Sequence, residues 1–244
     1  MERNTRLTRA FIGFVVSAAI ASTVYAGLKS HTLHLSQTLA VLALAALTSR
    51  MKVKLPGING TMSVNMPFLL IAVVSLSSVE AVVIACLSTA VQCWPKDKAK
   101  FKPEQMAFNL SMMAFAASAA SMIWNAGWIG HNAWASEPLM LASATATFFL
   151  GQTAPVAGIL KLTEGVALRR IWLSLAQLTF PYFVVSAGMT SMVNVVSHHM
   201  GWQLALAVFP VMFLIHRSYR MYFERAVAEA PKPVLMTRAA RAGA

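Results

Sequence analysis

Charged residues are scarce in this sequence. Asp, Glu, Lys and Arg together make up 11% of the 244 residues, whereas a typical soluble domain contains about 25%. So few charges cannot cover the surface of a soluble protein of this length, and 57% of the residues are hydrophobic. The mean hydropathy is +0.62. We therefore predict that much of the chain faces lipid.

Acidic residues are the scarcer of the two charge types, with 8 Asp and Glu against 20 Lys and Arg and a net charge of +12. In a soluble protein this balance indicates a nucleic-acid partner. In a membrane protein it has a simpler cause, because cytoplasmic loops collect Lys and Arg. We therefore predict the lipid bilayer as a partner and no nucleic acid.

Cysteine and catalytic motifs are also lacking. The two cysteines, Cys86 and Cys93, lie seven residues apart, about 10 Å along a helix. That separation is too long for a disulfide, and two cysteines are too few for a zinc site. The sequence has no helical His-Glu metal motif, nucleophile elbow or glycine-rich phosphate loop. We predict no metal, no cofactor and no enzymatic activity.

Seven apolar runs predict membrane-spanning helices, which need about 17–25 residues each. They are residues 9–28, 35–49, 63–94, 105–126, 139–160, 171–193 and 201–216. The run 63–94 either crosses once or turns near Ser77 and Ser78. With a turn, every Lys and Arg except Lys29 lies on the cytoplasmic side, as the positive-inside rule requires.

The predicted fold is therefore all-α, a polytopic integral membrane helix bundle of about eight spans with both termini cytoplasmic. The hairpin within residues 63–94 has helices of roughly 22 Å, so it either spans twice or is re-entrant. Residues 1–216 form the transmembrane domain, 217–230 a cytoplasmic exit helix and 231–244 a disordered basic tail. Val24, Tyr25 and Ala26 also fit a signal-peptide cleavage site, which leaves the remaining topology unchanged.

Glu80 is the one acidic residue inside an apolar run. A carboxylate at membrane depth indicates a functional site, so we predict that Glu80 contacts a ligand or ion. The structural interpretation is a capping box with Ser77, in which each residue bonds to the other's backbone N–H at the start of a helix. The two interpretations are compatible.

Polar residues inside other spans are the remaining candidates for ligand binding. Such groups either hydrogen-bond between helices or line a cavity. The predicted ligand-binding residues besides Glu80 are Asn65, Gln92, Asn109 and Gln152. Pro67, Pro155, Pro181 and Pro210 also fall within spans, where prolines kink helices. Small residues at 111–121 and 142–147 predict close helix packing. Five histidines on the predicted outer side are interpreted as ordinary interface residues, with metal capture or pH sensing as the alternative: His31, His34, His131, His198 and His199.

Several stretches together resemble a known membrane module. They are LPGINGTMS at 55–63, SSVEA at 77–81, QCW at 92–94, TEG at 163–165, FPYF at 180–183 and RSYRMY at 217–222. The pattern resembles the multi-span sensor module found N-terminal to bacterial HD-GYP and GGDEF signalling domains, over roughly residues 10–225. The resemblance implies a bacterial inner-membrane location. No output domain follows in this sequence, so no cyclase or phosphodiesterase activity is carried over.

The resemblance implies a sensor that binds an unidentified small ligand and signals through the exit helix to a cytoplasmic partner. The predicted docking residues are Arg217, Tyr219, Arg220 and Tyr222, and the alternative is a segment that only anchors the chain. The short hairpin among longer spans also looks like the substrate-binding subunits of energy-coupling-factor vitamin transporters. Small-molecule uptake is therefore the second functional hypothesis.

Overall fold

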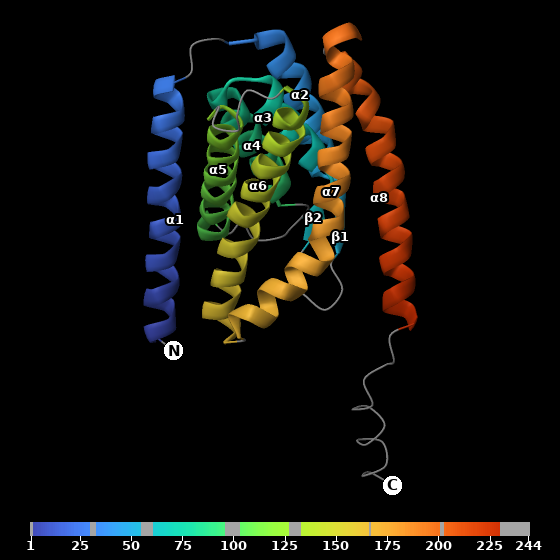
Figure 1. Cartoon of the computed structure of the whole chain (residues 1–244). Coiled ribbons are helices and arrows are strands. Elements are labelled where there is room, and N and C mark those ends of the chain that lie inside the picture. The colour runs from blue at the N-terminus through green and yellow to red at the C-terminus, as the bar shows by residue number, and fades with distance from the viewer. Residues whose placement is uncertain are drawn as a thin grey trace.

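The computed structural model describes residues 2–29, 33–54, 61–95, 103–126, 133–165, 167–200 and 203–229. Over these ranges the chain is a bundle of eight helices with one short hairpin of strands (Figure 1). The elements are α1 (Glu2–Lys29), α2 (Leu35–Ser49), β1 (Lys52–Lys54), β2 (Thr61–Ser63), α3 (Met66–Ser75), α4 (Ser78–Cys93), α5 (Pro103–Trp124), α6 (Ala133–Glu164), α7 (Leu168–Met200) and α8 (Leu204–Glu229). The predicted helical fold is thus confirmed, and the predicted turn near Ser77 and Ser78 separates α3 from α4.

The two strands are the part of the fold that the all-α prediction missed. β1 and β2 pair antiparallel, with Lys52 opposite Ser63 and Lys54 opposite Thr61. The β-branched residues Val53 and Thr61 favour extended backbone, and the Asn-Gly pair between the strands is typical of hairpins. Residues 55–60 of the motif lie outside the described part of the chain.

Among the described residues, four helical segments are long and apolar enough to cross a membrane: Arg6–Leu28, Pro103–Trp124, Glu137–Thr163 and Leu168–Ser197. The other apolar helices are shorter. α3 has 10 residues and α4 has 16, which correspond to about 15 and 24 Å. The other two short apolar helices are α2 and the apolar part of α8, Leu206–Ser218.

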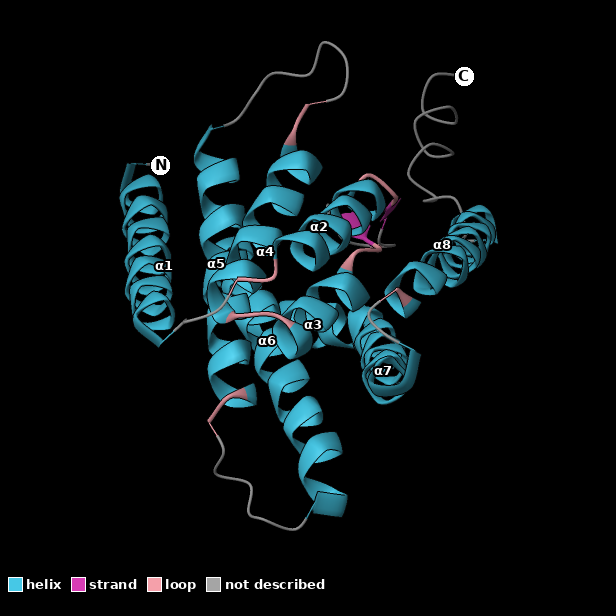
Figure 2. Cartoon of the chain, turned by 90° about the horizontal axis from the view of Figure 1, so that it is seen from above, coloured by secondary structure: helices cyan, strands magenta, loops and turns pink. Residues whose placement is uncertain are grey.

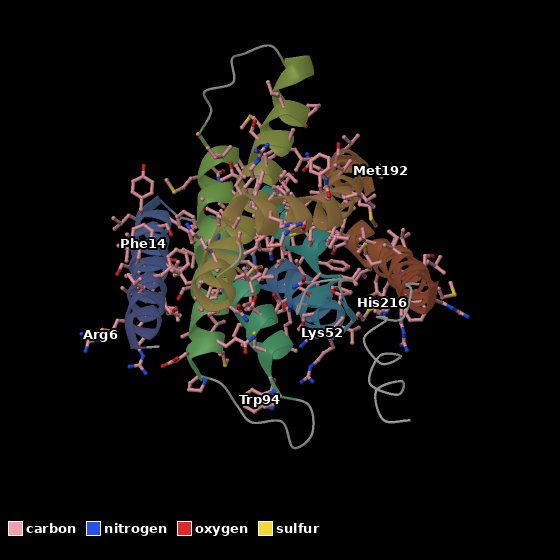
Figure 3. The ribbon with its side chains drawn as sticks, turned by 90° about the horizontal axis from the view of Figure 1, so that it is seen from below. Arg6, Phe14, Lys52, Trp94, Met192 and His216 are labelled. Atoms are coloured by element: carbon pink, nitrogen blue, oxygen red, sulfur yellow. The ribbon has the colours of Figure 1, made fainter. Side chains whose placement is uncertain are left out.

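Outward-facing side chains agree with a membrane setting. Phe14 on α1 and Met192 on α7 are each 70% exposed (Figure 3). Large apolar residues also face outward on α8, where Leu214 is exposed. Soluble monomers rarely expose apolar surface on this scale. Exposed apolar faces on α1, α7 and α8 are what lipid contact requires.

α3 lies at the centre of the bundle (Figure 2). It packs against α2, α4, α5, α7 and α8, and every residue from Met66 to Val73 is buried. A helix that is apolar on all sides is stable only when other helices surround it. Pro67 was predicted to kink a span. It instead lies in the first turn of α3, where proline starts a helix without loss of a hydrogen bond.

α1 and α6 both pack closely against α5. The Phe11 and Phe108 rings of α1 and α5 lie 6.3 Å apart. Gly151 of α6 lies so near Ala116 of α5 that an added Cβ would stand 3.1 Å from its Cα. This contact confirms the prediction of close packing for the small residues of 111–121.

The last two helices carry internal prolines, Pro181 in α7 and Pro210 in α8. α7 changes direction along its length (Figure 1), as proline in a helix interior predicts. α8 is helical without a break from Leu204 to Glu229, so the predicted boundary at residue 216 does not interrupt it. α1 begins and α8 ends at the same end of the bundle (Figure 1). The predicted tail at 231–244 lies outside the described residues.

Candidate functional site at the junction of α2 and α4

Glu80 lies where the N-terminal ends of α2 and α4 meet. It is only 4% exposed. The capping box predicted from the sequence is confirmed: Ser77 Oγ accepts the Glu80 N–H at 3.3 Å, and Glu80 Oε2 accepts the Ser77 N–H at 2.9 Å. Ser77 Oγ also donates to Oε2 at 2.8 Å. One of the two carboxylate oxygens, Oε2, therefore closes the first turn of α4, the helix that contains Glu80.

The other carboxylate oxygen reaches a different helix. Oε1 accepts the backbone N–H of His34 at 2.7 Å and the Thr38 hydroxyl at 2.6 Å. His34 is the N-cap residue of α2, and its own side chain makes no capping hydrogen bond. Glu80 thus does for α2 what the glutamate of a capping box does for its own helix. We call Glu80, Ser77, His34 and Thr38 the Glu80 junction.

The electrostatic basis of the junction is two helix N-termini rather than an ion pair. The four donors to the carboxylate are two backbone N–H groups and two hydroxyls, all uncharged. The N-terminal ends of α2 and α4 each carry partial positive charge, which favours an anion. A buried carboxylate with two hydrogen bonds on each oxygen meets the requirement that buried charges be fully bonded.

Asn65 lies at the start of α3, in a second buried polar cluster. Its Oδ1 accepts the Ser63 hydroxyl at 2.9 Å, and its Nδ2 is buried with no partner among the described residues. The Tyr182 hydroxyl of α7 accepts the Met66 N–H at 3.0 Å. The first turn of α3 is therefore closed by a side chain from α7.

The remaining predicted ligand-binding residues lie at helix–helix contacts. Asn109 of α5 donates through Nδ2 to Cys93 Sγ of α4 at 3.3 Å. Gln152 of α6 donates through Nε2 to Met113 Sδ of α5 at 3.1 Å. Gln92 is half-buried and lies 12 residues after Glu80, about 18 Å along α4. The structure therefore does not bring these predicted ligand-binding residues together with Glu80. Asn109 and Gln152 instead form hydrogen bonds between neighbouring helices.

The predicted docking residues lie in the C-terminal half of α8, which continues to Glu229. The side chains of Arg217 and Arg220 are exposed. The side chains of Tyr219 and Tyr222 lie outside the described part. Among the described residues, no group of three or more His, Cys, Asp or Glu side chains could hold a metal ion.

The sequence did not predict three residues of the Glu80 junction and of the cluster at the start of α3. They are His34, Thr38 and Tyr182. His34 was noted only as an interface histidine, and its contribution is a backbone N–H that no side-chain pattern reveals. Tyr182 was part of the FPYF motif, and a hydroxyl inside an apolar span next to Pro181 is the signal that could have marked it.

No protein-family model, curated protein or solved structure matches this chain. The resemblance to the sensor module therefore rests on the sequence motifs alone. The fold defines the class coarsely, as a helical protein whose described residues include four helices long and apolar enough to cross a membrane.

Proposed function

We propose that this chain is a non-enzymatic membrane sensor, located in the bacterial inner membrane, that relays a signal from the Glu80 junction to a cytoplasmic partner through α8. The proposed topology is that of eight membrane segments with both termini cytoplasmic. The short helices α2, α3 and α4 and the apolar part of α8, Leu206–Ser218, then cross with the help of their neighbours. The location of the α1 start and the α8 end at one end of the bundle supports this topology (Figure 1).

The observation that carries the proposal is the position of α2. Its N-terminal end is bonded to Glu80. Its C-terminal end continues through Arg50 and Met51 directly into β1. α8 packs against both α2 and β1. α2 therefore connects the Glu80 junction at one end of the bundle with α8 near the other end.

α8 provides the output side of the relay. Val208 and Met212 are buried against the rest of the bundle, and the same helix continues to Glu229. A movement of the packed part is carried to the exit segment by a continuous helix. Ligand binding near the junction would compete for the hydrogen bonds of Glu80 and so change how α2 is held. A ligand shifts such an equilibrium only by its difference in affinity for the two arrangements.

A spin label on the exit helix tests the relay. The label is attached through Ser218→Cys, with Cys86→Ala and Cys93→Ser in the background, and its motion is measured in nanodiscs. We expect Glu80→Ala to increase the mobility of the label, because α2 loses its attachment to α4. Glu104→Ala, which removes an exposed carboxylate from α5, is the control and should leave the mobility unchanged. Unchanged mobility in a folded Glu80→Ala protein contradicts the relay.

Cross-linking in native membranes tests the partner. A cytoplasmic signalling protein that co-purifies with the full chain supports the sensor. Co-purification of an ATPase with a coupling subunit supports the uptake hypothesis instead. If no cytoplasmic protein is captured under mild cross-linking, the proposed partner is wrong.

A further inference from the structure

A groove lies between the C-terminal halves of α2 and α4, at the far end of these helices from the Glu80 junction. Its volume is about 460 Å³, and it is lined by Leu42, Ala46, Arg50, Leu87, Ala90, Val91 and Trp94. The α2 residues are spaced by four, and the α4 residues follow the i, i+3, i+4 and i+7 pattern. Each set therefore lies along one face of its helix. We call this feature the α2–α4 groove.

The groove follows from the side chains that face one another. α2 and α4 are held together at their N-terminal ends by Glu80. Farther along, Ala46 and Ala90 are too small to fill the space between the two helix axes. The larger residues Leu42 and Leu87 continue the apolar lining, and Leu87 is partly exposed. The result is an apolar groove that is open along the side of the bundle.

One end of the groove has a different chemistry. Arg50 is exposed and has no ion-pair partner among the described residues. Trp94 is 61% exposed and lies at the edge of the bundle (Figure 3). Lys52 follows two residues after Arg50, in β1. An exposed cation beside an exposed indole is typical of the level of lipid head groups.

We propose that the α2–α4 groove binds an anionic phospholipid, with one acyl chain along Leu42, Ala46 and Leu87 and the phosphate on Arg50. A guanidinium binds phosphate oxygens through two parallel N–H bonds, and the Trp94 indole packs at the glycerol level. The C-terminal ends of α2 and α4 carry partial negative charge. Phosphate binding at this end therefore depends on the Arg50 cation. This site is separate from the Glu80 junction, so it stands independently of the proposed relay.

Native mass spectrometry of the full chain tests the site. The protein is equilibrated in micelles with equal amounts of phosphatidylglycerol and phosphatidylcholine, and the retained lipids are counted. We expect preferential retention of phosphatidylglycerol and a loss of about fivefold in Arg50→Gln, equivalent to ~1 kcal/mol for one basic residue at an anionic surface. Arg6→Gln, a matched change on α1 away from the groove (Figure 3), should keep the retention of the unmodified protein.

A second variant tests the acyl-chain contact. Ala46→Leu fills the groove and keeps Arg50, so it should also reduce phosphatidylglycerol retention, with folding checked by circular dichroism and elution volume. Should Ala46→Leu not fold, a benzophenone side chain at Leu87 replaces it and should form a photoadduct with phosphatidylglycerol. The proposal is overturned by equal retention of the two lipids, by equal losses in Arg50→Gln and Arg6→Gln, by unchanged retention in folded Ala46→Leu, or by no photoadduct.

Discussion

The carboxylate of Glu80 accepts the backbone N–H of His34 at 2.7 Å, across 46 positions of sequence. The same carboxylate closes the first turn of its own helix through Ser77. One side chain therefore completes the N-terminal ends of two helices, and the packing of α2 against α4 depends on it.

Replacement of Glu80 by alanine should destabilise the protein strongly. The change leaves the His34 N–H, the Thr38 hydroxyl and the Ser77 N–H without their acceptor. A buried unpaired donor costs about 1–3 kcal/mol, so we expect the free energy of unfolding to fall by about 2–4 kcal/mol, measured by denaturation in detergent. Glu104→Ala removes an exposed carboxylate and should change it by less than about 0.5 kcal/mol. Equal effects of the two changes would show that the junction is not important for stability.

Glutamine at position 80 should also lower stability, by about 1–2 kcal/mol. Each carboxylate oxygen accepts a backbone N–H, from His34 on one side and from Ser77 on the other. The amide of glutamine has one oxygen, so its NH₂ group must face one of these donors. Wild-type stability of Glu80→Gln would contradict the described bonding of the two oxygens.

Tyr182→Phe should destabilise the protein by about 1–3 kcal/mol, because it leaves the buried Met66 N–H without its acceptor. The ring remains, so apolar packing is nearly unchanged. Thr163→Val is the control, since the Thr163 hydroxyl bonds only to carbonyls of its own helix at an exposed position. Thermal melts of the two variants in the same detergent compare them directly. Equal melting temperatures would show that the hydroxyl does not hold the start of α3.

Gly151→Leu should separate α6 from α5. An added Cβ at this position meets the Ala116 backbone at 3.1 Å, and overpacking of this kind costs about 1–3 kcal/mol. Gly188→Leu is the matched control, because an added Cβ at Gly188 meets no atom within 4 Å. The fraction of folded protein after size-exclusion chromatography measures both. A loss no greater for Gly151→Leu than for the control contradicts the close contact.

Substitutions in the exit helix distinguish a docking surface for a cytoplasmic partner from a membrane anchor. Tyr219, Tyr222 and Phe223 follow helical spacing, which puts them on one face. A docking surface needs the rings, so Tyr219→Ala combined with Tyr222→Ala should abolish co-purification of the cytoplasmic partner while insertion stays normal. Arg217→Gln with Arg220→Gln serves as the comparison, since an anchor depends on the positive charges. Retention of the partner by the double tyrosine variant means that these rings do not dock it.

Topology is tested with reporter fusions after residue 100 and after residue 218. The positive-inside rule places both sites in the cytoplasm, so both fusions should show cytoplasmic reporter activity. A periplasmic signal at either site excludes the eight-segment topology.

Helix positions could be predicted because they depend on local sequence. The apolar run 35–49 became α2 with the same bounds, and the capping box marked the start of α4 at Ser78. Contacts between distant residues could not be predicted in this way. The bond from Glu80 to His34 and the bond from Met66 to Tyr182 join residues 46 and 116 positions apart. Neither leaves a periodic pattern in the sequence. The candidate site was therefore predicted at Glu80 itself, while its bonding partners on α2 were not.

The contact between Met66 and Tyr182 has a consequence for synthesis in the cell. α3 leaves the ribosome 116 residues before the tyrosine that closes its first turn. At roughly 5–20 residues per second, the interval is about 6–23 s. During that time the buried N–H of Met66 must be satisfied by water or by the translocation machinery. The central helix of this protein is thus made early and completed late, when α7 arrives beside it.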